Sequence, residues 1–158
     1  MPPRAKVPPI GSISEGTLNS IDLLSAFADA LEEYGTGAPH IELVNEARDL
    51  LEEFDAADDG ETDAIDTEAA LIVDAMQDAL GEVAPPYCLF GTHAGDGADF
   101  GFWPQVESAQ EDDDVLKVED TSEVPKGYTG FVLHVNDHGN ATLYDYTRGR
   151  SREVWSVV

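Results

Sequence analysis

The chain has 158 residues and carries 33 acidic against 8 basic side chains, a formal net charge of −25 at pH 7. Such a charge repels nucleic acid and anionic lipid, so direct nucleic-acid binding and membrane association are excluded and a strongly basic partner is favoured. A hydrophobic fraction of 42% is ordinary for a globular protein, and the single cysteine, Cys88, excludes an intramolecular disulfide.

Localisation follows from the same composition. No apolar stretch approaches the ~20 residues of a membrane span. The first dozen residues contain two bases but no apolar signal-peptide core. We therefore expect a cytoplasmic protein, in the host cytoplasm if the gene belongs to a phage.

The acids are unevenly distributed along the chain. Residues 1–83 hold 20 acids and 3 bases, whereas residues 84–158 hold 13 acids and 5 bases. The change coincides with Pro85 and Pro86, which would stop a helix. We predict a flexible arm over residues 1–16, an acidic helical region over 17–83 and an antiparallel β region over 84–158, which either stands apart or packs with the helices as one domain.

Three apolar stripes with helical spacing precede the prolines. They run through Leu18, Ile21, Leu24, Ala28 and Leu31; through Ile41, Val44, Leu51 and Phe54; and through Ile65, Ala69, Ile72, Met76 and Leu80. Thr17 is the expected cap of the first helix and Gly35 its end, and Gly81 is the expected left-handed terminator of the third.

Strand patterns follow the prolines. Aromatic, apolar runs at residues 87–92 and 100–103 flank a glycine-rich turn. Residues 105–114 are expected to form an acidic loop, and residues 115–118 a short strand.

The last three predicted strands, residues 130–135, 141–147 and 153–157, are separated by connectors rich in Gly and Asn, residue types that accept positive φ. A three-stranded antiparallel meander results. The fold class is therefore α+β, with about three acidic helices first and a small antiparallel sheet after them.

The second predicted helix carries four carboxylates at intervals of four, three and four residues: Glu42, Glu46, Asp49 and Glu53. Neighbours in this row are separated by roughly 5–6 Å along the helix axis. That spacing is of the same order as the ~3.4 Å between phosphates on one strand of a duplex. The row therefore predicts an anionic surface that fits a groove built for nucleic acid, supported by Glu52, Asp55, Asp58 and Asp59. A solvated outer face is the plainer interpretation of any one charged stripe.

A second cluster, Cys88-x4-His93-x2-Asp96-x2-Asp99, gathers possible metal ligands after the helices. It matches no established ligand spacing, and a thiol is a poor companion for hard carboxylates. We expect a glycine turn there and predict no metal or other cofactor. A small enzyme or metal site around this cluster and His134 stays open as an alternative, although no catalytic set is predicted.

The only basic cluster consists of Arg148, Arg150 and Arg152. In so acidic a chain we expect these arginines to pair with local acids rather than to contact phosphate.

The tail resembles uncharacterised small proteins of phages and plasmids. The resemblance is carried by residues 134–144 (HVNDHGNATLY), by Arg148-Gly149-Arg150 and by the final Arg152-Glu153-x-Trp155-Ser156-Val157-Val158, with Pro86-Tyr87-Cys88 and Phe100-Gly101-Phe102-Trp103 adding to it. It implies no activity. Acidic phage proteins of this size include nucleic-acid mimics that block restriction enzymes or CRISPR complexes, an analogy of charge and size.

Two functional hypotheses follow from the charge. In the first, the chain is a binding protein whose acidic helical surface occupies the basic nucleic-acid groove of a host defence complex, as an inhibitor of restriction or CRISPR systems. In the second, the acidity is an adaptation to high salt and says nothing of function, as the count of only three lysines also suggests.

Overall fold

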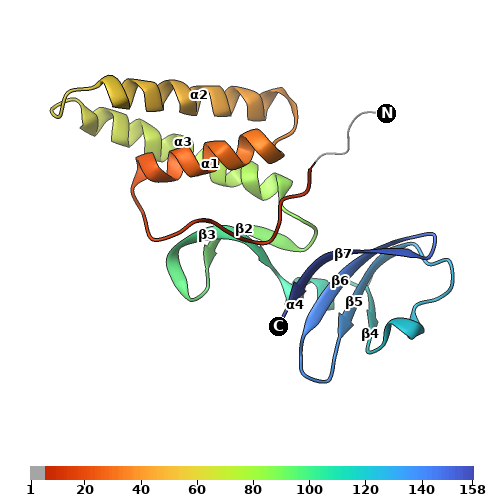
Figure 1. Ribbon diagram of the computed structural model, residues 1–158. Coiled ribbons are helices and arrows are strands. Elements are labelled where there is room, and N and C mark those ends of the chain that lie inside the picture. Colours follow the sequence, from red (N-terminus) through yellow and green to blue (C-terminus); the bar gives the residue numbers. More distant parts are fainter. Residues whose placement is uncertain (1–5) are drawn as a thin grey trace. The chain divides into compact units, whose positions relative to one another are not determined.

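The computed structural model describes residues 6–158, and the chain forms two compact units (Figure 1). The first contains the described residues up to Ala84 together with Leu89–Trp103, and the second contains Pro85–Cys88 and Pro104–Val158. The chain thus enters the second unit, returns to the first and leaves it again. The expected boundary at residue 84 was too simple, because residues 89–103 belong with the helices.

The first unit is built on three helices, as the periodicity predicted: α1 (Ser20–Tyr34), α2 (Gly37–Ala56) and α3 (Thr62–Val83). α2 packs on α1 and α3 (Figure 1). Its buried side chains are few and small to medium, including Val44, Ala47 and Leu50. The partly buried Leu43, Leu51 and Phe54 complete this apolar stripe, and the opposite face of the helix is free to be polar.

The helix ends differ from the prediction in two places. Asn19, not Thr17, caps α1, since its side-chain oxygen accepts from the backbone N–H of Ile21 and Asp22 at 2.9 and 3.3 Å. The predicted end at Gly35 is confirmed. Gly81 does not terminate α3, which continues to Val83, because that glycine keeps a negative φ.

Two residues of the predicted apolar stripes are exposed. Leu18 precedes α1 and is 67% exposed, and Ile41 on α2 is 61% exposed. Helical spacing alone placed them on the apolar stripes. Packing buries only the side chains that face a neighbouring helix, and the third stripe, from Ile65 to Leu80, is buried as predicted.

A three-stranded sheet completes the first unit, in the order β1-β3-β2, from β1 (Gly11–Ser14), β2 (Cys88–His93) and β3 (Asp96–Pro104). β1 runs antiparallel to β3. The predicted arm over residues 1–16 is therefore wrong for Gly11–Ser14, while residues 1–5 lie outside the described part. Gly101 permits this pairing, because a Cβ there would lie 2.1 Å from the Gly11 carbonyl oxygen.

An aromatic cluster joins helix to sheet inside this unit. Phe27 of α1 meets Phe90 and Phe100 edge-on, with ring centroids 5.1 and 5.3 Å apart, and Phe90 lies 5.0 Å from Phe102. These rings are buried. They explain why residues 89–103 stay with the helices rather than with the strands that follow.

The second unit contains a four-stranded sheet in the order β4-β5-β6-β7, from β4 (Leu116–Val118), β5 (Gly130–Val135), β6 (Ala141–Thr147) and β7 (Arg150–Val157). The antiparallel meander of β5, β6 and β7 confirms the prediction. β4 pairs parallel with β5, so the sheet is mixed rather than purely antiparallel.

Three elements of the second unit differ from the sequence expectation. The expected acidic loop contains the short helix α4 (Val106–Glu111), whose Ala109 is buried, and a 3-10 turn spans Thr121–Glu123. β7 begins earlier than predicted, because Arg148 and Gly149 alone make the turn, with φ of 52° and 82°.

The second unit has its own core. Leu133, Leu143 and Trp155 are buried, and the Trp155 indole N–H donates to the Pro86 carbonyl at 2.9 Å. None of the described helices in either unit is long and apolar enough to cross a membrane.

Candidate functional site

The eight acids singled out by the sequence lie on or directly after α2. Six are on the helix, and Asp58 and Asp59 lie in the loop that leads to α3. All eight side chains are exposed. They occupy regular backbone or a short loop between helices, so their spacing is held by the fold.

The four acids of the predicted row, Glu42, Glu46, Asp49 and Glu53, form the surface that we call the α2 ridge. At 3.6 residues per turn they share one face of α2, turned away from the buried stripe through Val44 and Leu50. At ~1.5 Å per residue the ridge is about 16 Å long. A duplex strand carries roughly five phosphates over that length.

The four supporting acids do not extend this ridge. Glu52 and Asp55 follow Arg48 by four and seven residues and therefore share its side of the helix. Asp58 and Asp59 lie beyond the helix end. The predicted set thus divides into an ordered ridge of four carboxylates, two acids on another side of α2 and two acids in the loop that follows it.

Arg48 is the one Lys or Arg residue on the three helices, and its side chain pairs with two acids of α1. Its Nη2 donates to Oδ1 of Asp29 at 2.6 Å and to Oε2 of Glu32 at 2.9 Å. These hydrogen bonds, that to Asp29 above all, raise the pKa of Arg48. Sequence reasoning missed this contact, although Arg48 is conspicuous as one of three bases in the first 83 residues.

The ridge carboxylates keep their charge unpaired. The other acids of the helical unit with a side-chain partner of this kind are Glu33, which pairs with Lys6 at 3.6 Å, and Glu82, which is hydrogen-bonded to His40 at 2.9 Å. Over residues 6–158, no ion pair or side-chain hydrogen bond involves a ridge acid. The ridge therefore presents four free charges to solvent.

Helix stability does not explain where these acids lie. The last turns of α1, α2 and α3 all carry acids and no base. An acid at a helix C-terminus opposes the helix dipole at a cost of about 0.3–1 kcal/mol, and like charges four apart cost a few tenths more. The acidic side chains therefore lower the stability of the helices, and hydrophobic packing offsets that cost.

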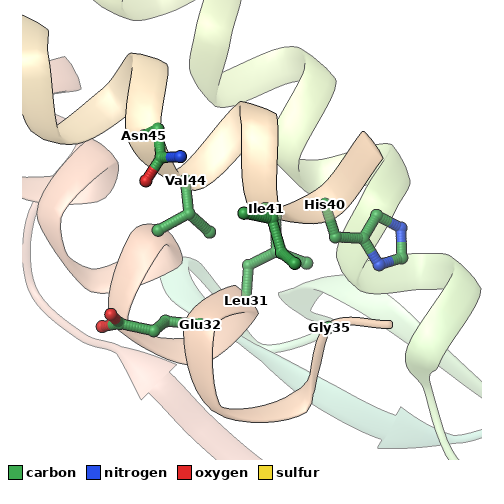
Figure 2. A pocket seen from close by; sticks show the side chains of 7 residues that line it. All are labelled: Leu31, Glu32, Gly35, His40, Ile41, Val44 and Asn45. Carbon is green, nitrogen blue, oxygen red and sulfur yellow. The ribbon is translucent and has the colours of Figure 1, made fainter. Parts of the chain in front are cut away.

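A small hollow lies between the C-terminal part of α1 and the N-terminal part of α2 (Figure 2). Its volume is about 170 Å³, and the side chains of Leu31, Ile41 and Val44 point into it. Ligand sites for drug-sized molecules start near ~300 Å³. The hollow has no nucleophile in its lining and is a gap in helix packing rather than a catalytic site.

His40 beside this hollow has a structural role that the sequence did not reveal. Its ring points toward α3 (Figure 2), where Nε2 lies 2.9 Å from Oε2 of Glu82. Its Nδ1 accepts from the Thr36 backbone N–H at 2.9 Å, so Nδ1 carries no hydrogen. The ring is therefore neutral with its hydrogen on Nε2. Its two hydrogen bonds connect the α1–α2 turn to α3.

The alternative cluster from Cys88 to Asp99 does not converge. His93 Nδ1 accepts from the Gly95 N–H at 3.0 Å, and Asp96 accepts from the Ala98 N–H at 3.0 Å. Both side chains thus serve the hairpin turn between β2 and β3. Across residues 6–158, no group of three or more His, Cys, Asp or Glu side chains is placed to hold a metal ion.

The cysteine and histidine of the enzyme alternative are also poorly placed for catalysis. Burial raises the pKa of the Cys88 thiol to about 12, so the nucleophilic thiolate is suppressed near neutral pH. His134 Nε2 lies 3.0 Å from the Glu119 carbonyl oxygen, which can only accept, so that nitrogen donates. The Cys88 thiol therefore lacks the thiolate that nucleophilic catalysis needs, and no hydrogen bond in the described chain joins it to His134, whose Nδ1 is left as the basic nitrogen.

Comparison with known protein families, with curated proteins and with solved structures returned no match. The resemblance of the tail to small phage and plasmid proteins therefore stays a prediction. The site must be judged on its own chemistry.

Proposed function

We propose that the chain is a cytoplasmic acidic binding protein whose α2 ridge occupies the basic nucleic-acid groove of a host defence complex. The partner would be a restriction enzyme or an RNA-guided nuclease, and the effect would be inhibition. The observation that carries the proposal is the ridge itself, four exposed carboxylates on one helical face without an ion pair among the described residues.

The mechanism is competition for the groove. Lysines and arginines that neutralise phosphates would meet the ridge carboxylates instead, and opposite charge would speed the encounter. Arg48 supports this role by pairing with Asp29 and Glu32 of α1, which leaves the α2 acids free. The expected phage or plasmid origin of the tail fits a protein directed against such defences.

The test is DNA binding by a panel of purified restriction enzymes and RNA-guided nucleases, measured by fluorescence anisotropy at increasing concentrations of the protein. We expect the protein to displace DNA from at least one of them, more effectively at low salt. The triple variant Glu42→Lys, Glu46→Lys and Asp49→Lys should lose this effect. Failure of the wild-type protein to displace DNA from any complex would refute the proposal.

A matched control keeps the result specific to the ridge. Glu107, Asp113 and Asp137 are exposed acids of the second unit with no ion pair in the described chain. Reversing all three to lysine changes the net charge as much as the ridge variant does. The control should still compete. Equal loss in both variants would assign the effect to overall charge.

Salt adaptation is the alternative that the same acids suggest, since all 20 acids before residue 84 are exposed. Thermal melting against KCl separates the two. A mimic should stay folded at low salt, whereas a salt-adapted protein should unfold there, because repulsion among its acids is no longer screened.

A further inference from the structure

Four cations in the second unit remain without an acid partner. Lys117, Lys126, Arg148 and Arg150 make no ion pair in the described chain, whereas Arg152 lies 3.8 Å from Asp145. Lys117 donates to the Asp112 backbone carbonyl. The expectation that the basic cluster pairs with local acids therefore holds only for Arg152. In a chain with four times more acids than bases, unpaired cations are an anomaly.

Two of these cations line a common hollow that we call the turn pocket. It has a volume of about 480 Å³, and its lining includes Thr121, Lys126, Gly127, Tyr146, Arg148 and Gly149. The lining contains two cations and two hydroxyls and no carboxylate. Of the acids nearest in sequence, Asp145 contacts Arg152, Asp120 accepts from the Ser122 backbone N–H at 2.8 Å, and Glu123 lines a different hollow.

The backbone that carries these side chains is fixed by contacts between two turns. The Gly149 N–H donates to the Tyr128 carbonyl at 2.9 Å, and the Arg148 N–H donates to the Thr129 hydroxyl at 3.0 Å. Gly127 and Gly149 approach so closely that a Cβ on Gly149 would lie 3.2 Å from the Gly127 nitrogen. Lys126 and Arg148 are therefore held on neighbouring, interlocked turns.

We propose that the turn pocket binds the phosphate group of a small phosphomonoester. A guanidinium, an ammonium and two hydroxyls can approach the oxygens of a tetrahedral dianion from several directions. A carboxylate offers one charge and two oxygens in a plane, and so would use fewer of these donors. The pocket volume lies in the ~300–1,000 Å³ range of small-molecule sites.

The net negative charge of the chain limits the size of the ligand. A chain of net charge −25 repels a polyanion along its whole length, whereas a compact phosphate ester meets mainly the local cations within one Debye length, about 8 Å in physiological salt. The site is thus distinct from the α2 ridge and does not depend on its role.

The test is calorimetric titration of the full chain with inorganic phosphate, ribose 5-phosphate and a nucleoside monophosphate. We expect saturable binding, weakened about tenfold or more in the variant Lys126→Gln, Arg148→Asn. Asn is chosen because residue 148 has φ of 52°, which Asn tolerates. Near-ultraviolet circular dichroism checks that the variant is folded.

The control variant Lys117→Gln, Arg152→Gln removes the same charge outside the pocket and should bind as the wild type does. Tighter binding of the nucleotide, reduced by Tyr146→Leu, would support a ligand whose base stacks on Tyr146. Equal affinity for all three probes would support recognition of the phosphate alone. No binding, equal loss in the control variant, or tighter binding of a single-stranded oligonucleotide would overturn the proposal.

Discussion

Arg48 of α2 donates a hydrogen bond from Nη2 to Oδ1 of Asp29 on α1, at 2.6 Å. The same nitrogen reaches Glu32, so the single base on the three helices draws together two acids of the adjacent helix. This contact determines which part of the acidic surface stays unpaired, because it offsets part of the charge at Asp29 and Glu32 of α1 and leaves the α2 ridge without a counter-charge.

Replacing Arg48 by Gln should therefore destabilise the helical unit. The partners are 69% and 66% exposed, so we expect a modest loss of about 0.5–1 kcal/mol in low salt. Urea unfolding followed by circular dichroism measures it. The loss should shrink in 1 M KCl, and a loss that is independent of salt would show that Arg48 acts through packing rather than charge.

Neutralising the ridge should have the opposite effect on stability. The variant Glu42→Gln, Glu46→Gln and Asp49→Asn removes like charges one turn apart, so the free energy of unfolding should rise by a few tenths of a kcal/mol for the Glu42–Glu46 pair. Partner binding should fall at the same time. A lower unfolding free energy would show that the ridge acids make stabilising contacts.

His40 should tolerate loss of its acid partner better than loss of its ring. In His40→Ala the Thr36 N–H loses its acceptor and a buried ring is removed, so we expect a loss of about 2–3 kcal/mol. Glu82→Gln should cost little, because the amide oxygen can accept from Nε2 as the carboxylate does. A large loss in Glu82→Gln, measured by urea unfolding, would mean that His40 is charged.

The pair Tyr87–Asp112 should give the second unit a stability that depends on pH at both extremes. The Tyr87 hydroxyl donates to Asp112 at 2.6 Å, which lowers the pKa of Asp112 and, together with burial, raises that of Tyr87 to about 12. Stability from Asp112 is present above its ordinary pKa near ~4 and is lost as pH falls through the lowered value.

The tyrosine acts in the other direction. Its contribution is complete below the ordinary pKa near ~10 and is lost as pH rises from there to about 12. Tyr87→Phe should reduce the dependence on pH in both windows, as followed by Trp fluorescence during urea unfolding. An unchanged profile would show that the hydrogen bond is not formed in solution.

Cys88 should behave as an inert thiol. With its pKa raised to about 12 by burial, it should react with a chromogenic disulfide reagent at pH 8 far more slowly than in urea, where it is unfolded. The ratio of the two rates is the measurement. Equal rates would remove the burial argument and restore the enzyme alternative.

Much of the fold was readable from local patterns. The helical stripe from Ile65 to Leu80 and the strands Gly130–Val135 and Ala141–Thr147 were predicted because alternation and helical period depend only on neighbouring residues. The exposure of the ridge acids also followed from such a pattern, since four carboxylates at helical spacing must share a face.

Long-range contacts decided the rest. Whether Gly11–Ser14 is an arm or a strand depends on Gly101, ninety residues away, where the missing Cβ lets the two backbones meet. The packing of β2 and β3 against the helices depends on the contacts of Phe27 with Phe90 and Phe100. Neither of these long-range contacts can be predicted from a local sequence pattern.

The distribution of charge shows the same division. Composition determined that the surface is anionic, because so many acids cannot be buried. Only the tertiary structure decided which acids are neutralised, since Arg48 could have paired along its own helix and instead reaches Asp29 on α1. Likewise, only the interlocked turns at Gly127 and Gly149 bring Lys126 and Arg148 to one pocket, because ion pairing depends on distance in space and not on separation in sequence.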